Sequence, residues 1–433
     1  MNVRVVGAGL AGCEAAWQLA ERGIPVDLIE MKPRKFSPAH VSADFAELVC
    51  SNSFRSDELT NAVGLLKEEM RKLGSLIIRC ADETRVPAGG ALAVDRARFS
   101  AMVTEIIRRH PLITVIDREA AALPDGRVIT ATGPLTSDAL SLSISKLFPD
   151  RKMLSFFDSA APIVTCDSVD FERAYFASRY GKGSADYINC PMDRNEYTEF
   201  YNELVTAKEA RVHGFEDGLV FEGCLPIEVM ARRGVDTVRY GPLKPVGLRD
   251  PKTGEVPYAV VQLRKDNAEG TLYNIVGFQT HLTFSEQERV FSMIPALRSA
   301  QFVRYGVMHR NTYIDSPKLL DRYNRLKSEP RISFAGQITG VEGYVESAAS
   351  GLLTGVETAR ECLGLGPADF PKKTAIGALA LYTSEGAVSD FQPMNINFGI
   401  IDPADSAVKG KRNKKLALSE RSLSIIDGYT SSL

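Results

Sequence analysis

The chain has 433 residues, of which 44% are hydrophobic and 24% are charged, and its formal net charge at pH 7 is −2. A chain of this length exceeds what one hydrophobic core usually supports, so we expect two domains, or one large domain with an insertion. The charge excludes a globally basic nucleic-acid-binding protein, though not a local basic patch, and no stretch approaches the roughly 20 apolar residues of a membrane span.

The N-terminal segment has the pattern of a dinucleotide-binding turn. Val3–Val6 form a short apolar run, followed by a glycine-rich turn and then by small apolar residues at helical spacing. Gly7 permits the tight turn, Gly9 lets the backbone approach a pyrophosphate, and Gly12 allows close helix packing. The expected cofactor contacts in this turn are Gly7, Ala8, Gly9, Leu10, Ala11 and Gly12. Because a strand begins at once, we see no secretory signal and expect a cytoplasmic protein.

An acidic residue follows the second predicted strand. Val26–Ile29 form that strand, and Glu30 comes eighteen residues after Gly12. A carboxylate at this place accepts hydrogen bonds from ribose hydroxyls and repels a 2′-phosphate, which disfavours NADP at this site. A glycine motif alone is a weak signal, but the agreement of strand, helix, second strand and acid favours a dinucleotide site over a purely structural turn.

Two later segments, 128–134 and 331–336, each consist of a strand that reaches a glycine. In flavoproteins with the two-dinucleotide fold such strands return to the N-terminal sheet, which favours FAD over NAD. Small residues in 340–351 then open a helix that we expect to reach about Cys362, with its positive end facing the flavin. From this segment alone, a helix packed tightly on a sheet explains the small residues almost as well. The cofactor contacts expected in these segments are Gly133, Gly336, Ser347 and Ala348.

The middle of the chain must be inserted between the strands of one cofactor fold, because both ends belong to that fold. We therefore predict an α/β class, with a discontinuous Rossmann-like FAD-binding domain at 1–165 and 300–433 and an inserted α+β domain at 166–299 that faces the substrate. Alternating apolar and polar residues at 258–263 and 272–278 predict an antiparallel sheet with one solvated face.

Cysteines are the candidate reactive groups. The seven cysteines include no C-x-x-C pair, and the five histidines have no metal-binding spacing, so we expect thiols and no metal site. Cys50 precedes three short polar residues, and Cys224 lies between a strand-like run and a proline-bounded turn. Either thiol can be reactive, although a cysteine is more often a small buried hydrophobe.

Several sequence blocks carry a resemblance to a known family that runs nearly end to end. These blocks are GAGLAG at 7–12, AELVCSNS at 46–53, VPAGGALAVDR at 86–96, FEGCLPIEVMARRG at 221–234, YGVMHRNT at 305–312 and GVEGYVESAASG at 340–351. They resemble the TrmFO family of bacterial folate- and FAD-dependent tRNA (uracil-5-)-methyltransferases. The GidA-type tRNA-modifying flavoproteins share the cofactor fold but are longer. Phe54 departs from the family pattern, which commonly has leucine there, and this concerns only local packing.

The resemblance implies transfer of a one-carbon unit from 5,10-methylenetetrahydrofolate to C5 of uridine 54 in the tRNA T loop, with NADH or NADPH reducing the FAD. It implies that Cys224 is the nucleophile that adds to C6 of uracil. Cys50 is then a second functional thiol, near the flavin or assisting proton removal from C5, and Tyr344 is a ring that stacks on the isoalloxazine or the folate. Direct and flavin-mediated methylene transfer both stay open.

The expected partners are the tRNA T arm, folate and NAD(P)H, without a membrane or an obligate protein partner. Candidate RNA-contacting residues in the inserted region are Arg232, Arg233, Lys244 and Arg264, which are equally well explained as solvated surface charges. Three alternatives remain: the same chemistry on a ribosomal RNA uridine, a flavin oxidoreductase for a small molecule, and a non-catalytic RNA-binding flavoprotein.

Overall fold

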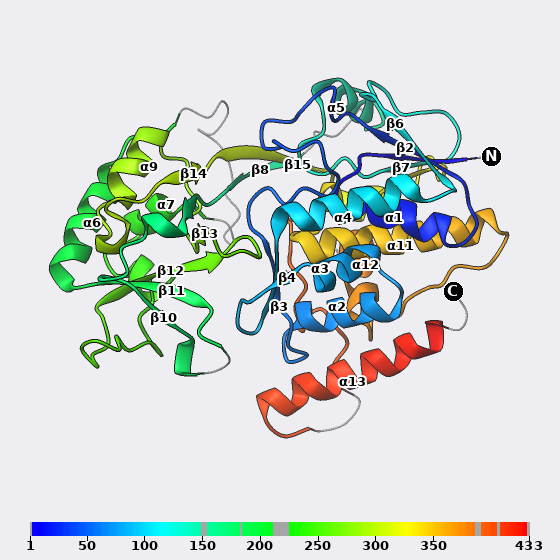
Figure 1. Ribbon diagram of the computed structural model, residues 1–433. Coiled ribbons are helices and arrows are strands. Elements are labelled where there is room, and N and C mark those ends of the chain that lie inside the picture. The colour runs from blue at the N-terminus through cyan, green and yellow to red at the C-terminus, as the bar shows by residue number, and fades with distance from the viewer. Residues whose placement is uncertain are drawn as a thin grey trace.

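Figure 1 shows the computed structural model, which describes residues 2–148, 154–181, 184–210, 225–385, 391–404 and 408–430. One part of the molecule is built around a five-stranded sheet, and the other around a six-stranded sheet. A two-stranded antiparallel ribbon, β8 (Leu154–Ser159) and β15 (Met308–Tyr313), runs between the two parts. In the part of the chain that is described, no helix is long and apolar enough to cross a membrane.

The five-stranded sheet is parallel throughout, in the order β16-β7-β1-β2-β6. Its strands are β1 (Val3–Val6), β2 (Val26–Glu30), β6 (Ile113–Asp117), β7 (Val128–Thr130) and β16 (Ile332–Phe334). The prediction that the two later strands return to the N-terminal sheet is confirmed, because β7 pairs with β1 and β16 pairs with β7. Burial on both faces explains why β7 and β16 are short runs without alternating exposure, whereas in the edge strand β6 only Ile113 is buried.

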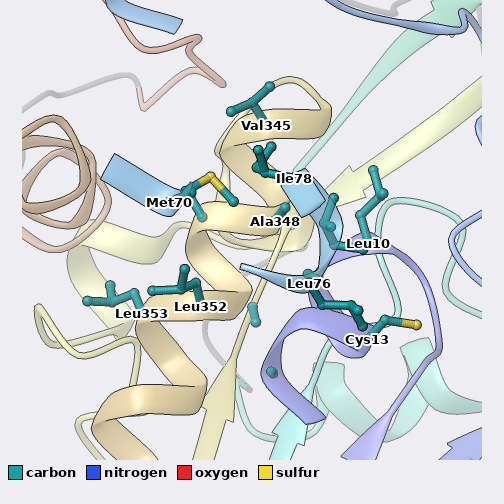
Figure 2. Close-up of a cluster of buried hydrophobic side chains, with 14 of the residues drawn as sticks. Leu10, Cys13, Met70, Leu76, Ile78, Val345, Ala348, Leu352 and Leu353 are labelled. Carbon is teal, nitrogen blue, oxygen red and sulfur yellow. The ribbon is translucent and has the colours of Figure 1, made fainter. Parts of the chain in front are cut away.

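Helices cover this sheet and form the larger hydrophobic core, part of which is drawn in Figure 2. The helices of that core are α1 (Leu10–Ala20), α2 (Ala62–Lys72), α3 (Leu76–Glu83), α4 (Arg96–Arg109), α11 (Tyr344–Cys362), α12 (Ala375–Glu385) and α13 (Lys411–Thr430), whereas α5 (Asp138–Ser145) and α10 (Ser316–Leu319) contribute to a separate, smaller core. The helix predicted to reach Cys362 is α11, and it packs closely on α1. A Cβ at Gly351 would lie 2.3 Å from the carbonyl oxygen of Ala11, so glycine is what permits this approach.

A small antiparallel sheet of β3 (Ser53–Ser56), β5 (Ala91–Val94) and β4 (Arg85–Val86) lies between the two main parts. β3 directly follows the segment that carries Cys50. Asn52 is fully buried there, and its side-chain amide donates to the carbonyl oxygens of Val94 and Lys265 at 2.8 and 2.9 Å. The Cys50 segment is therefore tied to both parts of the molecule.

The six-stranded sheet has the order β10-β11-β12-β13-β9-β14. Its strands are β9 (Ile163–Thr165), β10 (Tyr175–Ala177), β11 (Tyr187–Met192), β12 (Ala259–Lys265), β13 (Leu272–Ile275) and β14 (Phe302–Arg304), and its helices are α6 (Arg194–Thr206), α7 (Ile227–Arg232), α8 (Thr237–Tyr240) and α9 (Phe284–Phe291). The antiparallel pairing predicted from 258–263 and 272–278 is confirmed for β12 and β13, but the predicted solvated face is wrong for β12, where the consecutive residues Ala259–Val261 are all fully buried. Because β9 and β14 lie just outside 166–299, we propose that the inserted unit extends to residues 163 and 304.

Candidate functional site

A cavity of about 370 Å³ lies at the carboxyl ends of β1, β7 and β16. This edge of a parallel sheet is where open α/β folds bind their ligands. The predicted site residues that line the cavity are Gly7, Ala8, Gly9, Leu10, Ala11, Glu30, Cys50, Gly133, Gly336, Tyr344 and Ser347. The fold thus brings together residues from both ends of the chain.

The glycine turn has the geometry that a pyrophosphate requires. Gly7 has a φ of +97°, and a Cβ there would lie 2.6 Å from the carbonyl oxygen of Ala131. A Cβ at Gly12 would lie 1.8 Å from the carbonyl oxygen of Gly7, so Gly12 permits the close approach of α1 to the turn. Because Gly12 does not line the cavity, the prediction that it contacts the cofactor is corrected. A Cβ at Gly9 meets no atom within 4 Å. Open space therefore lies in front of Gly9, beside the N-terminus of α1, where a phosphate group fits.

Glu30 lies beside this turn and is only 7% exposed. Its carboxylate accepts hydrogen bonds from the backbone N–H groups of Ala8 at 2.7 Å and Lys32 at 2.9 Å. Two carboxylate oxygens offer about four acceptor positions, so acceptor capacity remains for the hydroxyls of a ribose. The acid and the turn together fit the ADP part of a dinucleotide.

The first turn of α11 faces the cavity on one side and the core on the other. Ser347 lines the cavity, whereas Ala348 is fully buried in the core together with Leu352 (Figure 2). The prediction that Ala348 contacts the cofactor is therefore corrected. Successive helical residues point about 100° apart, so the small side chain at 348 serves helix packing while its neighbour reaches the cavity.

Cys50 and Tyr344 meet in the wall of the cavity. The Tyr344 hydroxyl oxygen accepts hydrogen bonds from the N–H groups of Cys50 at 2.9 Å and Ser51 at 3.2 Å, and it lies 3.0 Å from the Cys50 Sγ. Burial, together with the nearby Cys50, raises the pKa of Tyr344 well above its ordinary value. The hydroxyl therefore stays protonated near neutral pH, and its proton can be shared with the sulfur.

Phe54 lies under this pair and is fully buried. Its ring centroid is 5.9 Å from that of Tyr344 and 5.4 Å from that of Phe99. The phenylalanine that departs from the family pattern thus supports the Tyr344 ring from below. Whether that ring stacks on a flavin or a folate stays a prediction.

Three arginines hold the Cys50 segment, and sequence reasoning did not find two of them. Arg96 donates to the carbonyl oxygen of Leu48, and Arg304 donates to that of Val49 at 2.8 Å. Arg96 lies at the start of α4, and Arg304 lies at the end of β14, in a different part of the chain. No local pattern marks a backbone contact of this kind, so only the VPAGGALAVDR block, which ends at Arg96, could have drawn attention to it.

The third arginine is Arg264, and its interpretation as a solvated surface charge is corrected. It is only 8% exposed and lines the cavity, and a contact with RNA there stays a prediction. Its guanidinium donates to the Ser51 Oγ at 2.7 Å and the Asn52 Oδ1 at 3.0 Å. The other three candidate RNA contacts, Arg232, Arg233 and Lys244, are exposed, and Arg232 is paired with Glu209.

Cys224, the predicted nucleophile, lies outside the described residues. The chain that follows it is described from Leu225, which is 5% exposed. The N–H of Ile227 donates to the carbonyl oxygen of Gln279 at 2.8 Å, and Gln279 lines the cavity. Across the described ranges, no group of three or more His, Cys, Asp or Glu side chains is arranged to hold a metal ion.

The parallel sheet, the glycine turn and the cavity at the carboxyl edge define a dinucleotide-binding α/β protein of the GidA type. The family model described as Glucose inhibited division protein A matches residues 2–366. Two crystal forms of GidA from Aquifex aeolicus superpose with a TM-score of 0.71 at 15% identity, covering 99–100% of this chain and 73–76% of theirs. At that identity the likeness concerns the fold.

Full-length relatives narrow the family further. Proteins named methylenetetrahydrofolate--tRNA-(uracil-5-)-methyltransferase TrmFO from Acetivibrio thermocellus and Lactobacillus johnsonii are 59% and 57% identical to this chain. Each alignment covers 99% of this chain and 98% of the relative. A relative of the same name from Desulforudis audaxviator is 59% identical over 424 residues. The chain belongs to the TrmFO family.

Proposed function

We propose that this protein transfers the one-carbon unit of 5,10-methylenetetrahydrofolate to C5 of uridine 54 in the tRNA T loop, giving 5-methyluridine. The observation that carries the proposal is the meeting of the Cys50 thiol and the Tyr344 hydroxyl in the wall of the cavity that contains the glycine turn. Reactive groups for a pyrimidine and a cradle for a dinucleotide then share one cavity. The names of the full-length relatives give the substrate class.

The proposed cofactor is FAD, which supplies the two electrons that convert a methylene into a methyl group. The glycine turn holds its pyrophosphate, and Glu30 accepts from its ribose. Gly133, Gly336 and Ser347 line the rest of the cavity. We propose NADH or NADPH as the external reductant, and the cytoplasm, where tRNA and folate occur together, as the compartment.

The two thiols have separate proposed roles. Uracil C5 becomes nucleophilic when a thiolate adds to C6, and Cys224 is the proposed nucleophile. After C5 has gained the one-carbon unit, its proton must leave before the Cys224–C6 bond can break. Cys50 is the proposed acceptor of that proton, and the Tyr344 hydroxyl stabilises the thiolate that precedes it by donating a hydrogen bond.

The test is transfer of label from methylenetetrahydrofolate to a tRNA transcript, in the presence of FAD and NAD(P)H. We expect label at uridine 54 with the wild type, and loss of transfer with Cys50→Ala and with Cys224→Ala. Cys362→Ala is the matched control, since Cys362 is exposed at the end of α11 and does not line the cavity. Methylation that requires S-adenosylmethionine would contradict the proposal.

The same assay separates the alternatives. Label in ribosomal RNA but not in tRNA would support the same methyl-transfer chemistry with ribosomal RNA as the substrate. A covalent adduct with a T-arm RNA containing 5-fluorouracil, formed by the wild type but not by Cys224→Ala, would support nucleophilic catalysis. An absence of adduct under every condition would favour a flavin oxidoreductase for a small molecule, and salt-sensitive RNA binding without transfer would favour a non-catalytic RNA-binding protein.

A further inference from the structure

We infer that His281, held as an imidazolium between Glu209 and Glu228, is a positioning residue that fixes the chain following Cys224 to the cavity wall. The inference rests on the proposed function, because it concerns the segment that carries the proposed nucleophile. It gives a role to a buried charged cluster in the inserted part of the molecule, distant from the glycine turn in sequence.

The arrangement of the cluster favours the positively charged form of His281. His281 is 2% exposed, and its Nδ1 lies 2.7 Å from Glu228 Oε1 while its Nε2 lies 2.8 Å from Glu209 Oε2. A neutral imidazole has one N–H, so two ionised carboxylates, one beside each ring nitrogen, favour a proton on both nitrogens. Glu228 is fully buried, and Arg232 pairs with Glu209 from the outer side. Among the described residues, these are the charged groups that face the ring.

The two carboxylates come from the two sides of residues 211–224. Glu209 is bridged to Leu282, and the N–H of Ala210 donates to the carbonyl oxygen of His281 at 2.8 Å. On the other side, the Glu228 carboxylate accepts hydrogen bonds from the backbone N–H of His281 and from the Thr280 hydroxyl, each at 2.8 Å. His281 therefore links the chain that leads into 211–224 with the chain that leaves it.

The link extends directly to the cavity. Gln279 lines the cavity, and its carbonyl oxygen accepts from the N–H of Ile227, three residues after Cys224. Residues 279–282 thus contact α7 at one end and Glu209 at the other. Loss of the imidazolium would leave two carboxylates facing one another and would release the start of α7 from this wall.

The cluster also predicts a pH dependence. Burial opposes the charge on the ring, but the contacts with Glu228 and Glu209 outweigh it and raise the pKa of His281 above its ordinary value. The charged form is complete below the ordinary value and is lost as pH rises through the raised one. Positioning by His281 should therefore weaken on the alkaline side.

The test compares His281→Gln and Glu209→Gln with His110→Gln as the matched control. His110 also pairs with a glutamate, Glu21 at 3.3 Å, but it lies in the other part of the molecule and does not line the cavity. The measurements are FAD content, the rate of covalent adduct formation with a T-arm RNA containing 5-fluorouracil at pH 6 to 9, and hydrogen exchange in the peptide that covers 225–232.

We expect His281→Gln to keep its FAD, to form the adduct about tenfold or more slowly, and to lose the alkaline decline of the wild type. Exchange at 225–232 should become faster, and Glu209→Gln should change both quantities in the same direction but less. The inference would be overturned if His281→Gln formed the adduct at the wild-type rate and showed wild-type hydrogen exchange at 225–232. If the wild type itself forms no adduct, the proposed function fails instead. In that case, faster exchange at 225–232 in His281→Gln would identify His281 as a purely structural residue.

Discussion

The Tyr344 hydroxyl is surrounded by the Cys50 segment, with two backbone N–H groups and one sulfur within 3.2 Å. Since both N–H groups donate to the oxygen, the hydroxyl proton is left for the sulfur. A single atom thus orders a segment that has no regular secondary structure and also supplies a hydrogen bond to its thiol. The pair explains why a tyrosine 294 residues away matters for Cys50.

Removing this hydroxyl tests the pair. We expect Tyr344→Phe to lower methyl transfer about tenfold or more while FAD content stays at the wild-type level, because two half-buried N–H groups lose their acceptor and the segment shifts. Tyr382→Phe is the control, since the Tyr382 hydroxyl donates to the carbonyl oxygen of Gln392 outside the cavity. Equal transfer rates in the two variants would contradict the assigned role.

The Arg264 guanidinium holds the Cys50 segment by two hydrogen bonds. Its two hydrogen bonds leave from different nitrogens of the guanidinium, and the ammonium of a lysine cannot reproduce that planar geometry. We therefore expect Arg264→Lys to reduce kcat/KM for tRNA several-fold or more without loss of FAD. The exposed Arg298→Lys should leave kcat/KM unchanged, and an identical result for both would show that the contacts to Ser51 and Asn52 are dispensable.

At the scale of elements, the contact between α1 and α11 joins the two ends of the chain under the cavity. Gly351 and Gly355 let the helices approach, because a Cβ at either position would lie 2.3 or 2.8 Å from a carbonyl oxygen of α1. The small residues that predicted a cofactor-facing helix are therefore explained in part by helix packing. Both interpretations hold for α11, since Ser347 faces the cavity and Gly351 faces α1.

Substituting a helical glycine should have opposite effects at two positions. Gly351→Ala should lower the free energy of unfolding by about 1–3 kcal/mol, because its methyl group overlaps the backbone of α1. Gly428→Ala, in α13, should raise it by up to about 1 kcal/mol, because a Cβ there meets no atom within 4 Å and alanine favours the helix. Urea unfolding measures both, and equal signs would contradict the packing argument.

For the whole molecule, one buried carboxylate joins three helices far apart in sequence. Glu69 of α2 accepts from the N–H groups of Ala375 and Ile376, which begin α12, at 2.7 and 2.9 Å. It also accepts from the hydroxyl of Ser422 in α13. Figure 1 shows α13 lying along the side of α2. Glu69 thus links both C-terminal helices to α2, alongside the ion pair of Lys72 with Asp427 and the hydrogen bond from Ser419 to the carbonyl oxygen of Leu59.

This acid should make stability depend on pH. Burial raises the pKa of Glu69 to about 7, although its hydrogen bonds oppose the shift. The folded state therefore holds the Glu69 proton more tightly than the unfolded state. The stabilisation that this proton gives to the folded state is complete below about pH 4.5 and is lost as pH rises through 7. From pH 5 to 8 we expect the free energy of unfolding of the wild type to fall by on the order of 2 kcal/mol more than that of Glu69→Gln.

Urea unfolding at pH 5, 6, 7 and 8 measures the difference between wild type and Glu69→Gln. Their free energies of unfolding should converge as the pH rises, with Glu69→Gln the less stable protein at pH 5, since its amide cannot accept all three hydrogen bonds. Glu420→Gln, on the exposed side of α13, should keep the wild-type slope. Parallel curves for wild type and Glu69→Gln would rule out this assignment.

Much of the cofactor fold followed from local patterns. The glycine turn, Glu30 and the two strands that reach Gly133 and Gly336 were recognised because tight turns and buried parallel strands restrict residue types locally. The error at Ala348 has the same origin, since helix packing and ligand contact select the same small side chains. The burial of Arg264 does not follow from its sequence context, because an arginine in a strand carries no sign of which partner it will meet.

Local sequence patterns predict which residues turn, pair and pack at short range, and the sequence blocks indicate the family. The meetings of distant side chains emerge only from the folded molecule: Tyr344 with Cys50, Arg264 with Ser51, and His281 with Glu209 and Glu228. The physical reason is that periodicity and turn chemistry act over a few residues, whereas these contacts depend on how separate elements dock. The reactive part of the site belongs to the second kind.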